Sequence, residues 1–169
     1  HNAVAAAALA FAAGLSLAEV SDGLKNFSNI KGRLNIKQGI KDATLIDDTY
    51  NANPDSMKAA IDVLAAMPAP RIFVMGDMGE LGEDEAAAMH AEVGAYARDK
   101  GIEAAYFVGD NSVEAAETFG AEGLWFADKD PLIQVLSHDL PERATVLVKG
   151  SRFMKMEEVV EALTDKEVV

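Results

Sequence analysis

Strand-like apolar runs alternate with helix-patterned stretches from Gly32 onward, and this alternation constrains the fold more strongly than any other feature of the chain. The predicted strands are Leu34–Gln38, Ala43–Asp47, Arg71–Met75, Ala104–Val108, Leu124–Phe126 and Thr145–Val148. The predicted helices are Pro54–Met67, Asp84–Lys100, Ser112–Phe119, Pro131–Leu140 and Met154–Leu163. Strands joined through helices run parallel, and the helices cover both faces of their sheet. The sequence therefore predicts a doubly wound α/β fold with a mainly parallel sheet.

The first two predicted strands are joined differently from the others. Only the turn-like stretch Gly39–Asp42 separates them. Two strands joined by so short a loop pair antiparallel. We therefore expect an antiparallel hairpin at one edge of the sheet.

Two helical patterns, Asn2–Ala13 and Ser16–Lys25, precede the α/β region and predict a helical hairpin. Gly14 interrupts the pattern, and Ser16 is a residue type that caps helix N-termini. The alanine-rich first pattern is too short to span a bilayer and follows no basic segment. We interpret it as a buried helix.

A cluster of Asn and Ser residues just before Gly32 marks a change in sequence texture. It gives two predicted domains, residues 1–30 and 31–169. Because the chain starts at His1 inside a helical pattern, we expect it to be a fragment of a longer protein, with His1 itself foreign to that protein.

Charge and cysteine content exclude several classes of function. The chain carries 15 Lys and Arg against 28 Asp and Glu, a formal net charge of -13, so nucleic acid would be repelled. Because cysteine is absent, there is no disulfide, thiolate metal site or cysteine nucleophile. No metal-ligand spacing occurs in the sequence. We expect a cytoplasmic monomer that binds neither nucleic acid nor membranes.

Polar residues and glycines follow the predicted strands. They are Asp47, Asp48, Gly76, Asp77, Gly109, Asp110, Asp128, Lys149, Gly150 and Ser151. In open α/β sheets, ligands bind beyond the carboxyl ends of the strands. The sequence therefore predicts a small-ligand site along this edge of the sheet.

The densest polar segment is residues 47–57, which leads from a strand end into a helix. Asp47 and Asp48 should point to opposite faces of the strand, so one of them is expected to be functional rather than both. Asn53 followed by Pro54 is typical of a helix start, which is an alternative to a ligand-binding role for Asn53.

Tyr50 and Asn51 have no such structural explanation and are the first candidates for ligand contact. Arg33, ahead of the first strand, could bind phosphate oxygens through two parallel hydrogen bonds. Lys149 and Ser151 follow the last strand and offer a cation and a hydroxyl to a carboxylate or phosphate. Solvated side chains are the alternative interpretation of Arg33, Lys149 and Ser151.

Two further features are interpreted as structural. The loop Gly76–Gly82 has three glycines in seven residues, yet it lacks the spacing of a P-loop or dinucleotide fingerprint. A sharply bent loop explains it equally well. His90 has no acid or nucleophile at the spacing of a catalytic triad, so we expect it to be packed or solvated.

Four separated motifs together resemble the Mur ligases in order and spacing. They are Gly32-Arg33-Leu34, the segment from Asp47 to Pro54, the loop Gly76–Gly82, and Lys149-Gly150-Ser151-Arg152. Asn2 and the alanines after it are similar to the end of a motif in the family's central domain. The resemblance covers essentially the whole chain and is greatest to the members that add D-alanyl-D-alanine.

This resemblance implies an enzyme of peptidoglycan synthesis with three domains. Residues 1–30 would be the last helices of its central ATPase domain, and residues 31–169 its C-terminal, Rossmann-like domain. ATP would convert the carboxylate of a UDP-muramoyl tripeptide to an acyl phosphate, and the amine of D-alanyl-D-alanine would attack it. The P-loop and the Mg²⁺ ligands would lie in the domains outside this chain, so the chain alone should be inactive.

The resemblance also implies roles for single residues. Asn2 would contact adenine, Arg33 would reach and stabilise the ATP phosphates, and Asp48 would bind the ribose hydroxyls. The implied D-alanyl-D-alanine contacts are Tyr50, Asn51 and Asn53, with Lys149 and Ser151 on the opposite side.

A free-standing receiver-like or flavodoxin-like binding module is the alternative interpretation. Asp47, Asp48, Asp77 and Lys149 loosely follow the acids and late lysine of receivers. The helical hairpin and the long polar loop after Asp48 do not fit that class. A phosphatase of the haloacid dehalogenase type would need Asp-x-Asp, and the adjacent acids here have the wrong spacing.

Overall fold

The computed structural model of the chain describes residues 2–25 and 31–165. The chain divides into two compact units, residues 1–30 and residues 31–169. Each unit is described by itself.

The first unit is a hairpin of two helices, α1 (Asn2–Ala12) and α2 (Leu17–Lys25). Gly14 lies between them with a φ of +90°, a conformation that glycine adopts without a steric penalty. Ser16 and Glu19 cap the start of α2, since the Glu19 carboxylate accepts the Ser16 N–H at 2.8 Å and the Ser16 hydroxyl accepts the Glu19 N–H at 3.3 Å. The expected helical hairpin is confirmed. The interpretation of its first helix as buried is wrong for this unit, since Val4 and Leu9 are each 73% exposed.

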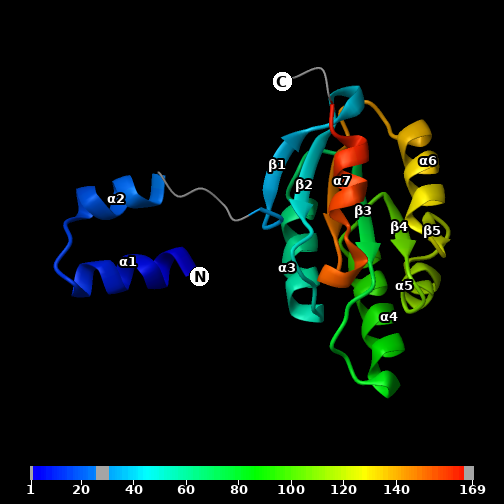
Figure 1. Cartoon of the computed structure of the whole chain (residues 1–169), viewed down its shortest axis with the longest axis horizontal. Helices are drawn as coiled ribbons and strands as arrows, with labels where there is room; N and C mark the ends of the chain where they lie inside the picture. Colours follow the sequence, from blue (N-terminus) through cyan, green and yellow to red (C-terminus); the bar gives the residue numbers. More distant parts are fainter. Residues whose placement is uncertain (1, 26–30, 166–169) are drawn as a thin grey trace. The chain divides into compact units, whose positions relative to one another are not determined.

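The second unit is built on a six-stranded sheet with the order β1-β2-β6-β3-β4-β5 (Figure 1). The strands are β1 (Asn35–Gln38), β2 (Thr44–Asp48), β3 (Arg71–Gly76), β4 (Ala104–Val108), β5 (Gly123–Phe126) and β6 (Thr145–Lys149). Only β1 runs antiparallel to its neighbour, β2. The predicted α/β sheet with an antiparallel edge hairpin is therefore confirmed.

Helices cover both faces of this sheet. On one face α3 (Pro54–Ala65), α4 (Glu83–Asp99) and α5 (Ser112–Phe119) pack in one hydrophobic cluster. On the other face α6 (Lys129–Asp139) and α7 (Glu157–Leu163) pack in a second cluster. The unit thus has three layers, and the central strands are buried on both sides.

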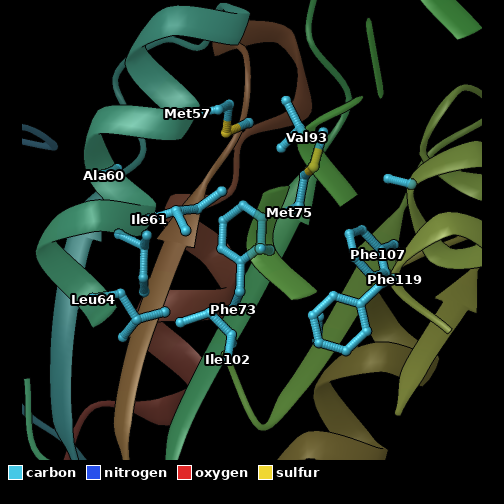
Figure 2. Close-up of a cluster of buried hydrophobic side chains, with 14 of the residues drawn as sticks. Met57, Ala60, Ile61, Leu64, Phe73, Met75, Val93, Ile102, Phe107 and Phe119 are labelled. Carbon is cyan, nitrogen blue, oxygen red and sulfur yellow. The ribbon is translucent and has the colours of Figure 1, made fainter. Parts of the chain in front are cut away.

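Alternate residues of β3 serve the two clusters. Phe73 and Met75 face α3 and α4, whereas Ile72 and Val74 lie in the cluster under α6 and α7. Figure 2 shows the side chains of α3 directed toward Phe73, whose ring meets Phe107 edge to face with centroids 6.3 Å apart. Because both faces of β3 pack against apolar side chains, the polar groups of this part of the sheet lie at its strand ends.

The predicted helix Met154–Leu163 was wrong in its first part. A short 3-10 turn, η2 (Arg152–Met154), precedes Lys155, which has a φ of +49°, and α7 starts only at Glu157. The ammonium of Lys129 donates a hydrogen bond of 2.8 Å to the Met154 carbonyl, which α7 leaves without a helical partner. The segment after β6 therefore forms a separate turn beside the strand ends.

At the opposite end of β3, Arg71 ties the strand to its surroundings. Its guanidinium donates hydrogen bonds to both carboxylate oxygens of Glu103, at 2.7 and 3.0 Å, and to the carbonyls of Ala65 and Gly101. The hydrogen bond from Arg71 lowers the pKa of Glu103 below its ordinary value of 4.5.

This pairing predicts a small acid-dependent loss of stability. A carboxyl with a lowered pKa in the folded state stabilises the fold above its ordinary pKa and loses that contribution as pH falls through the folded pKa. In Glu103→Gln, the free energy of unfolding should therefore fall less steeply below about pH 4.5 than in the unchanged chain. The difference should be less than about 1 kcal/mol, because the Glu103 side chain is 42% exposed. Urea unfolding across that pH range, against the unchanged chain, measures the effect, and an unaltered pH profile would contradict it.

Candidate functional site

The candidate site lies where β2, β6 and β3 end. Asp48 at the end of β2 is paired in register with Lys149 at the end of β6, and Met75 of β3 is paired with Lys149 from the other side. The loops that follow these strands therefore emerge next to one another. The structure thus brings most of the residues singled out from the sequence to one edge.

Asp48 and Lys149 form a shielded ion pair at the centre of this edge. The ammonium nitrogen lies 2.6 Å from Asp48 Oδ2, with side-chain exposures of 4% and 14%. The ammonium also donates a hydrogen bond of 2.8 Å to the carbonyl of Asn51, while Asp48 Oδ1 accepts the N–H of Leu34 at 3.2 Å. Two charges so far from water are tolerated because each has further hydrogen-bonding partners.

Asp47 makes a different set of contacts, as expected for neighbours on a strand. Its carboxylate is buried and accepts hydrogen bonds from the Lys37 ammonium at 2.8 Å and the Thr49 hydroxyl at 2.7 Å. The two acids share none of these contacts. Asp48 is the acid that contacts the Lys149 ammonium and the N–H of the residue after Arg33.

Arg33 and Tyr50 form an exposed pair beside this ion pair. The guanidinium carbon lies 4.6 Å from the centroid of the Tyr50 ring, and 45% of Tyr50 is exposed. The Tyr50 N–H donates to the carbonyl of Gly32 at 2.9 Å, and Gly32 has a φ of +74° with Tyr50 N only 3.0 Å from where a Cβ would lie. No described carboxylate forms an ion pair with Arg33. Its five N–H donors are therefore available to an anionic ligand.

The two asparagines of the loop differ in function. The Asn53 side-chain oxygen accepts the Ser56 N–H at 2.8 Å, and the Ser56 hydroxyl accepts the Asn53 N–H at 3.0 Å, so Asn53 caps α3 just before Pro54. The predicted helix start at Asn53-Pro54 is confirmed, and a ligand contact of Asn53 stays a prediction. Asn51 is exposed, and its side-chain oxygen accepts the N–H of the adjacent Ala52 at 2.9 Å. Unlike Asn53, Asn51 caps no described helix.

Ser151 joins two loops instead of facing outward. Its hydroxyl accepts the N–H of Gly79 at 2.6 Å and lies 3.4 Å from the carbonyl of Ala52, and its own N–H donates to the carbonyl of Asp77. Only 2% of Ser151 is exposed. The loop after β2 and the loop after β3 are thus held together by one residue after β6.

Hydrogen bonds of Asp77 and His90 hold the loop 77–82 against α4 and α5. Asp77 accepts the Ser112 hydroxyl at 2.6 Å and the Asn111 N–H at 3.1 Å. His90 Nε2 accepts the Met78 N–H at 2.9 Å and Nδ1 donates to the Ala86 carbonyl. With Nε2 acting as an acceptor, the 3.7 Å approach of His90 to Asp77 is not a charge pair. The interpretation of His90 as a packed residue is confirmed.

Sequence reasoning had left two features of the site unrecognised. The Ser112–Asp77 bond was missed, although Asp77 directly follows β3 and Ser112 starts the helix that follows the adjacent strand β4. The burial of Lys149 and Ser151 was also missed, since both were expected to line the ligand side. The side chain of Asn2 lies outside the described residues, so its adenine contact stays a prediction.

Two absences hold for the part of the chain that the structure describes. Within residues 2–25 and 31–165, no three His, Asp or Glu side chains gather closely enough to hold a metal ion. Over the same residues, no helix is both long enough and apolar enough to cross a membrane.

Comparison with known proteins adds to this geometry. The family model described as "Mur ligase, glutamate ligase domain" matches residues 32–152, which include all four motifs at the strand ends. The chain belongs to the Mur ligase family. The resemblance seen in the sequence is thereby confirmed, and the receiver-like alternative is not supported, since its phosphate-accepting Asp77 is 5% exposed and already hydrogen-bonded.

Individual family members are similar over nearly all of the chain. The UDP-N-acetylmuramoyl-tripeptide--D-alanyl-D-alanine ligase of Escherichia coli K12 is 46% identical over 97% of the chain, which spans 36% of that protein. A crystal structure of MurF from Acinetobacter baumannii superposes with a TM-score of 0.82 at 38% identity, over 95% of this chain and 36% of that one. The MurF ligase of Thermotoga maritima in complex with ADP shares the fold, with a TM-score of 0.77 at 24% identity over 92% of this chain and 35% of that one. The chain thus spans about a third of the length of the curated relatives it matches.

Proposed function

We propose that this chain is the C-terminal part of an ATP-dependent ligase that joins D-alanyl-D-alanine to a UDP-muramoyl tripeptide in peptidoglycan synthesis. Residues 1–30 would close its central ATPase domain and residues 31–169 would form its last domain. The complete ligase would act in the cytoplasm as a monomer. Its Mg²⁺ ligands and P-loop would lie outside this chain.

The observation that carries the proposal is the exposed Arg33–Tyr50 pair beside the shielded Asp48–Lys149 pair, in a chain 46% identical to such a ligase over its length. Arg33 offers unpaired donors suited to phosphate oxygens. Asp48 retains acceptor capacity for ribose hydroxyls, because a carboxylate can accept about four hydrogen bonds and two are accounted for. A ligase that shares this fold, that of Thermotoga maritima, has been crystallised in complex with ADP.

The dipeptide half of the site is the loop after Asp48. Tyr50, Asn51 and Asn53 would border D-alanyl-D-alanine there, with the main chain near Lys149 and Ser151 on the other side. In the reaction, the tripeptide carboxylate attacks the γ-phosphate of ATP and releases ADP. The dipeptide amine then attacks the acyl phosphate, and phosphate leaves as the amide forms. This chain would contribute orientation and stabilisation of phosphate charge through Arg33.

Amide NMR on the labelled chain tests the proposal directly. ATP should shift the amides of Arg33 and Asp48, and D-alanyl-D-alanine those of Tyr50 and Asn51, at millimolar concentrations typical of weak binding. L-alanyl-L-alanine is the matched control and should leave the Tyr50 and Asn51 amides unchanged. If neither ATP nor D-alanyl-D-alanine shifts these amides, or the L-dipeptide shifts them equally, the proposed site is wrong.

Turnover gives an independent measurement. The complete ligase that contains this chain should release phosphate from ATP only when both the UDP-muramoyl tripeptide and D-alanyl-D-alanine are present. The 169-residue chain alone should release none. Release by the complete enzyme without the dipeptide would point to another substrate.

Replacing Arg33 gives a sharper prediction about the nucleotide half. In the complete ligase, Arg33→Ala should lower kcat/KM for ATP by about 100-fold, because it removes the cation proposed to stabilise transferring phosphate. Tyr50→Ala should lower it only about two- to fivefold, the share expected from an exposed cation–π contact. Tyr50→Phe keeps the ring and serves as the control, with little change toward ATP. Equal effects of Arg33→Ala and Tyr50→Phe would contradict this assignment.

A further inference from the structure

We propose that Lys149 is a positioning residue, which holds the nucleotide half and the dipeptide half of the site in a fixed relation. It would act through Asp48 and Asn51 rather than by touching a ligand. The naming of the two halves rests on the proposed function. The mechanical part of the proposal rests on the contacts alone.

The first observation is that one ammonium bonds both halves. Lys149 lies 2.6 Å from Asp48 Oδ2, which belongs to the proposed nucleotide half. It lies 2.8 Å from the carbonyl of Asn51, which belongs to the proposed dipeptide half. Asp48 is the last residue of β2 and Asn51 lies in the loop beyond it, so the ammonium sets how that loop leaves the strand.

The second observation is that the contact extends to Arg33 through the backbone. Asp48 Oδ1 accepts the N–H of Leu34, the residue after Arg33. The Tyr50 N–H donates to the carbonyl of Gly32, the residue before it. Arg33 is thus held on both sides, once through Asp48 and once through the loop that Lys149 fixes. Moving the ammonium would release both attachments.

The third observation is burial. The Lys149 side chain is 4% exposed, whereas Tyr50, the residue before Asn51, is 45% exposed. A ligand that lay against the exposed groups would therefore meet little of the ammonium. The central place of β6 between β2 and β3 explains this, because a side chain at the end of a central strand is covered by the loops of both neighbours.

The test is kinetic and is made in the complete ligase. Lys149→Met should raise the KM for ATP and the KM for D-alanyl-D-alanine together, each by about tenfold, because both halves lose their common attachment. Lys37→Met is the matched control, since it removes the ammonium from the buried Asp47, one residue earlier on β2. It should reduce stability without changing either KM.

Two further measurements keep the proposal open to refutation. If Lys149→Met does not fold, Lys149→Arg takes its place in the kinetic test. Arginine retains the charge but cannot place its donors where the ammonium lies, so both KM values should again rise. In the 169-residue chain, hydrogen exchange at the Leu34 amide should quicken in Lys149→Arg or Lys149→Met while the amide of Val148, inside β6, stays protected.

The outcomes separate the two proposals. A rise in only one KM, or kinetics like those of Lys37→Met, would reject Lys149 as the link between the halves. Unchanged exchange at Leu34 would reject the mechanical link whatever the substrates are. If the unaltered ligase does not depend on D-alanyl-D-alanine, the proposed function fails, and the exchange measurement still decides whether Lys149 fixes Asp48.

Discussion

Gly94→Ala is expected to lower the free energy of unfolding by about 3 kcal/mol, although the same change inside most helices would stabilise them. Gly94 lies in α4 where this helix crosses α5. A Cβ there would lie 2.6 Å from the Thr118 hydroxyl and 2.7 Å from the carbonyl carbon of Ala115. Backbone cannot yield as a flexible side chain does, so the helices must move apart, and overpacking of this kind costs about 1 to 3 kcal/mol or more.

The helix preference of alanine works against this loss but is smaller. Alanine gains about 1 kcal/mol over glycine in a helix interior. Moving α5 would also break the bond of 2.7 Å that the Thr118 hydroxyl donates to the Ala91 carbonyl of α4. The clash and the lost bond together exceed the gain in propensity.

Gly82→Ala is the control for this experiment. Gly82 precedes α4 with a φ of -60°, and nothing lies within 4 Å of an added Cβ. The unfolding free energy of Gly82→Ala, measured in urea, should differ from that of the unchanged chain by less than about 0.5 kcal/mol. A Gly94→Ala chain as stable as the control would mean that α4 and α5 are not in close contact.

The α4–α5 contact matters for the site as well as for stability. His90 of α4 binds the Met78 N–H, and Ser112 of α5 binds Asp77. Both helices therefore hold the loop after β3, which Ser151 joins to the loop after β2. Separating α4 from α5 would therefore disturb the loop after β3.

Local sequence patterns were sufficient to predict most of the fold. Each crossover pairs an apolar run with an amphipathic stretch, and the short Gly39–Asp42 connection identifies the antiparallel edge. The helix start at Asn53-Pro54 follows from capping chemistry within four residues. These features depend on neighbours in the sequence, so a pattern can reveal them.

The burial of Lys149 could not be predicted in the same way. The last strand, β6, inserts between β2 and β3, and this order is a property of the whole sheet rather than of any local segment. A basic residue followed by Gly150 has the same local pattern whether neighbouring loops cover it or not. The Arg33–Tyr50 contact was easier to predict from the sequence than the burial of Lys149, because the predicted hairpin places the start of β1 beside the end of β2.

Asp48→Ala is the second change with a large expected effect, and it should lower the free energy of unfolding by about 3 to 5 kcal/mol. The reason is the ammonium left behind. Lys149 would remain 4% exposed in the unaltered fold, with the Asn51 carbonyl but without a counter-charge. Asp99→Ala provides the comparison, because the Arg98–Asp99 pair is 53% and 66% exposed and its loss should cost about 0.5 kcal/mol or less.

The double variant Asp48→Ala with Lys149→Met separates stability from function. Removing both charges removes the unpaired ammonium, so the double variant should be more stable than Asp48→Ala, as measured by urea unfolding of all four members of the cycle. Additive losses would instead show that the two side chains do not depend on each other. Nucleotide binding should not return with stability, because the carboxylate proposed to bind the ribose hydroxyls is still missing. A double variant that regains both would show that Asp48 serves the fold alone.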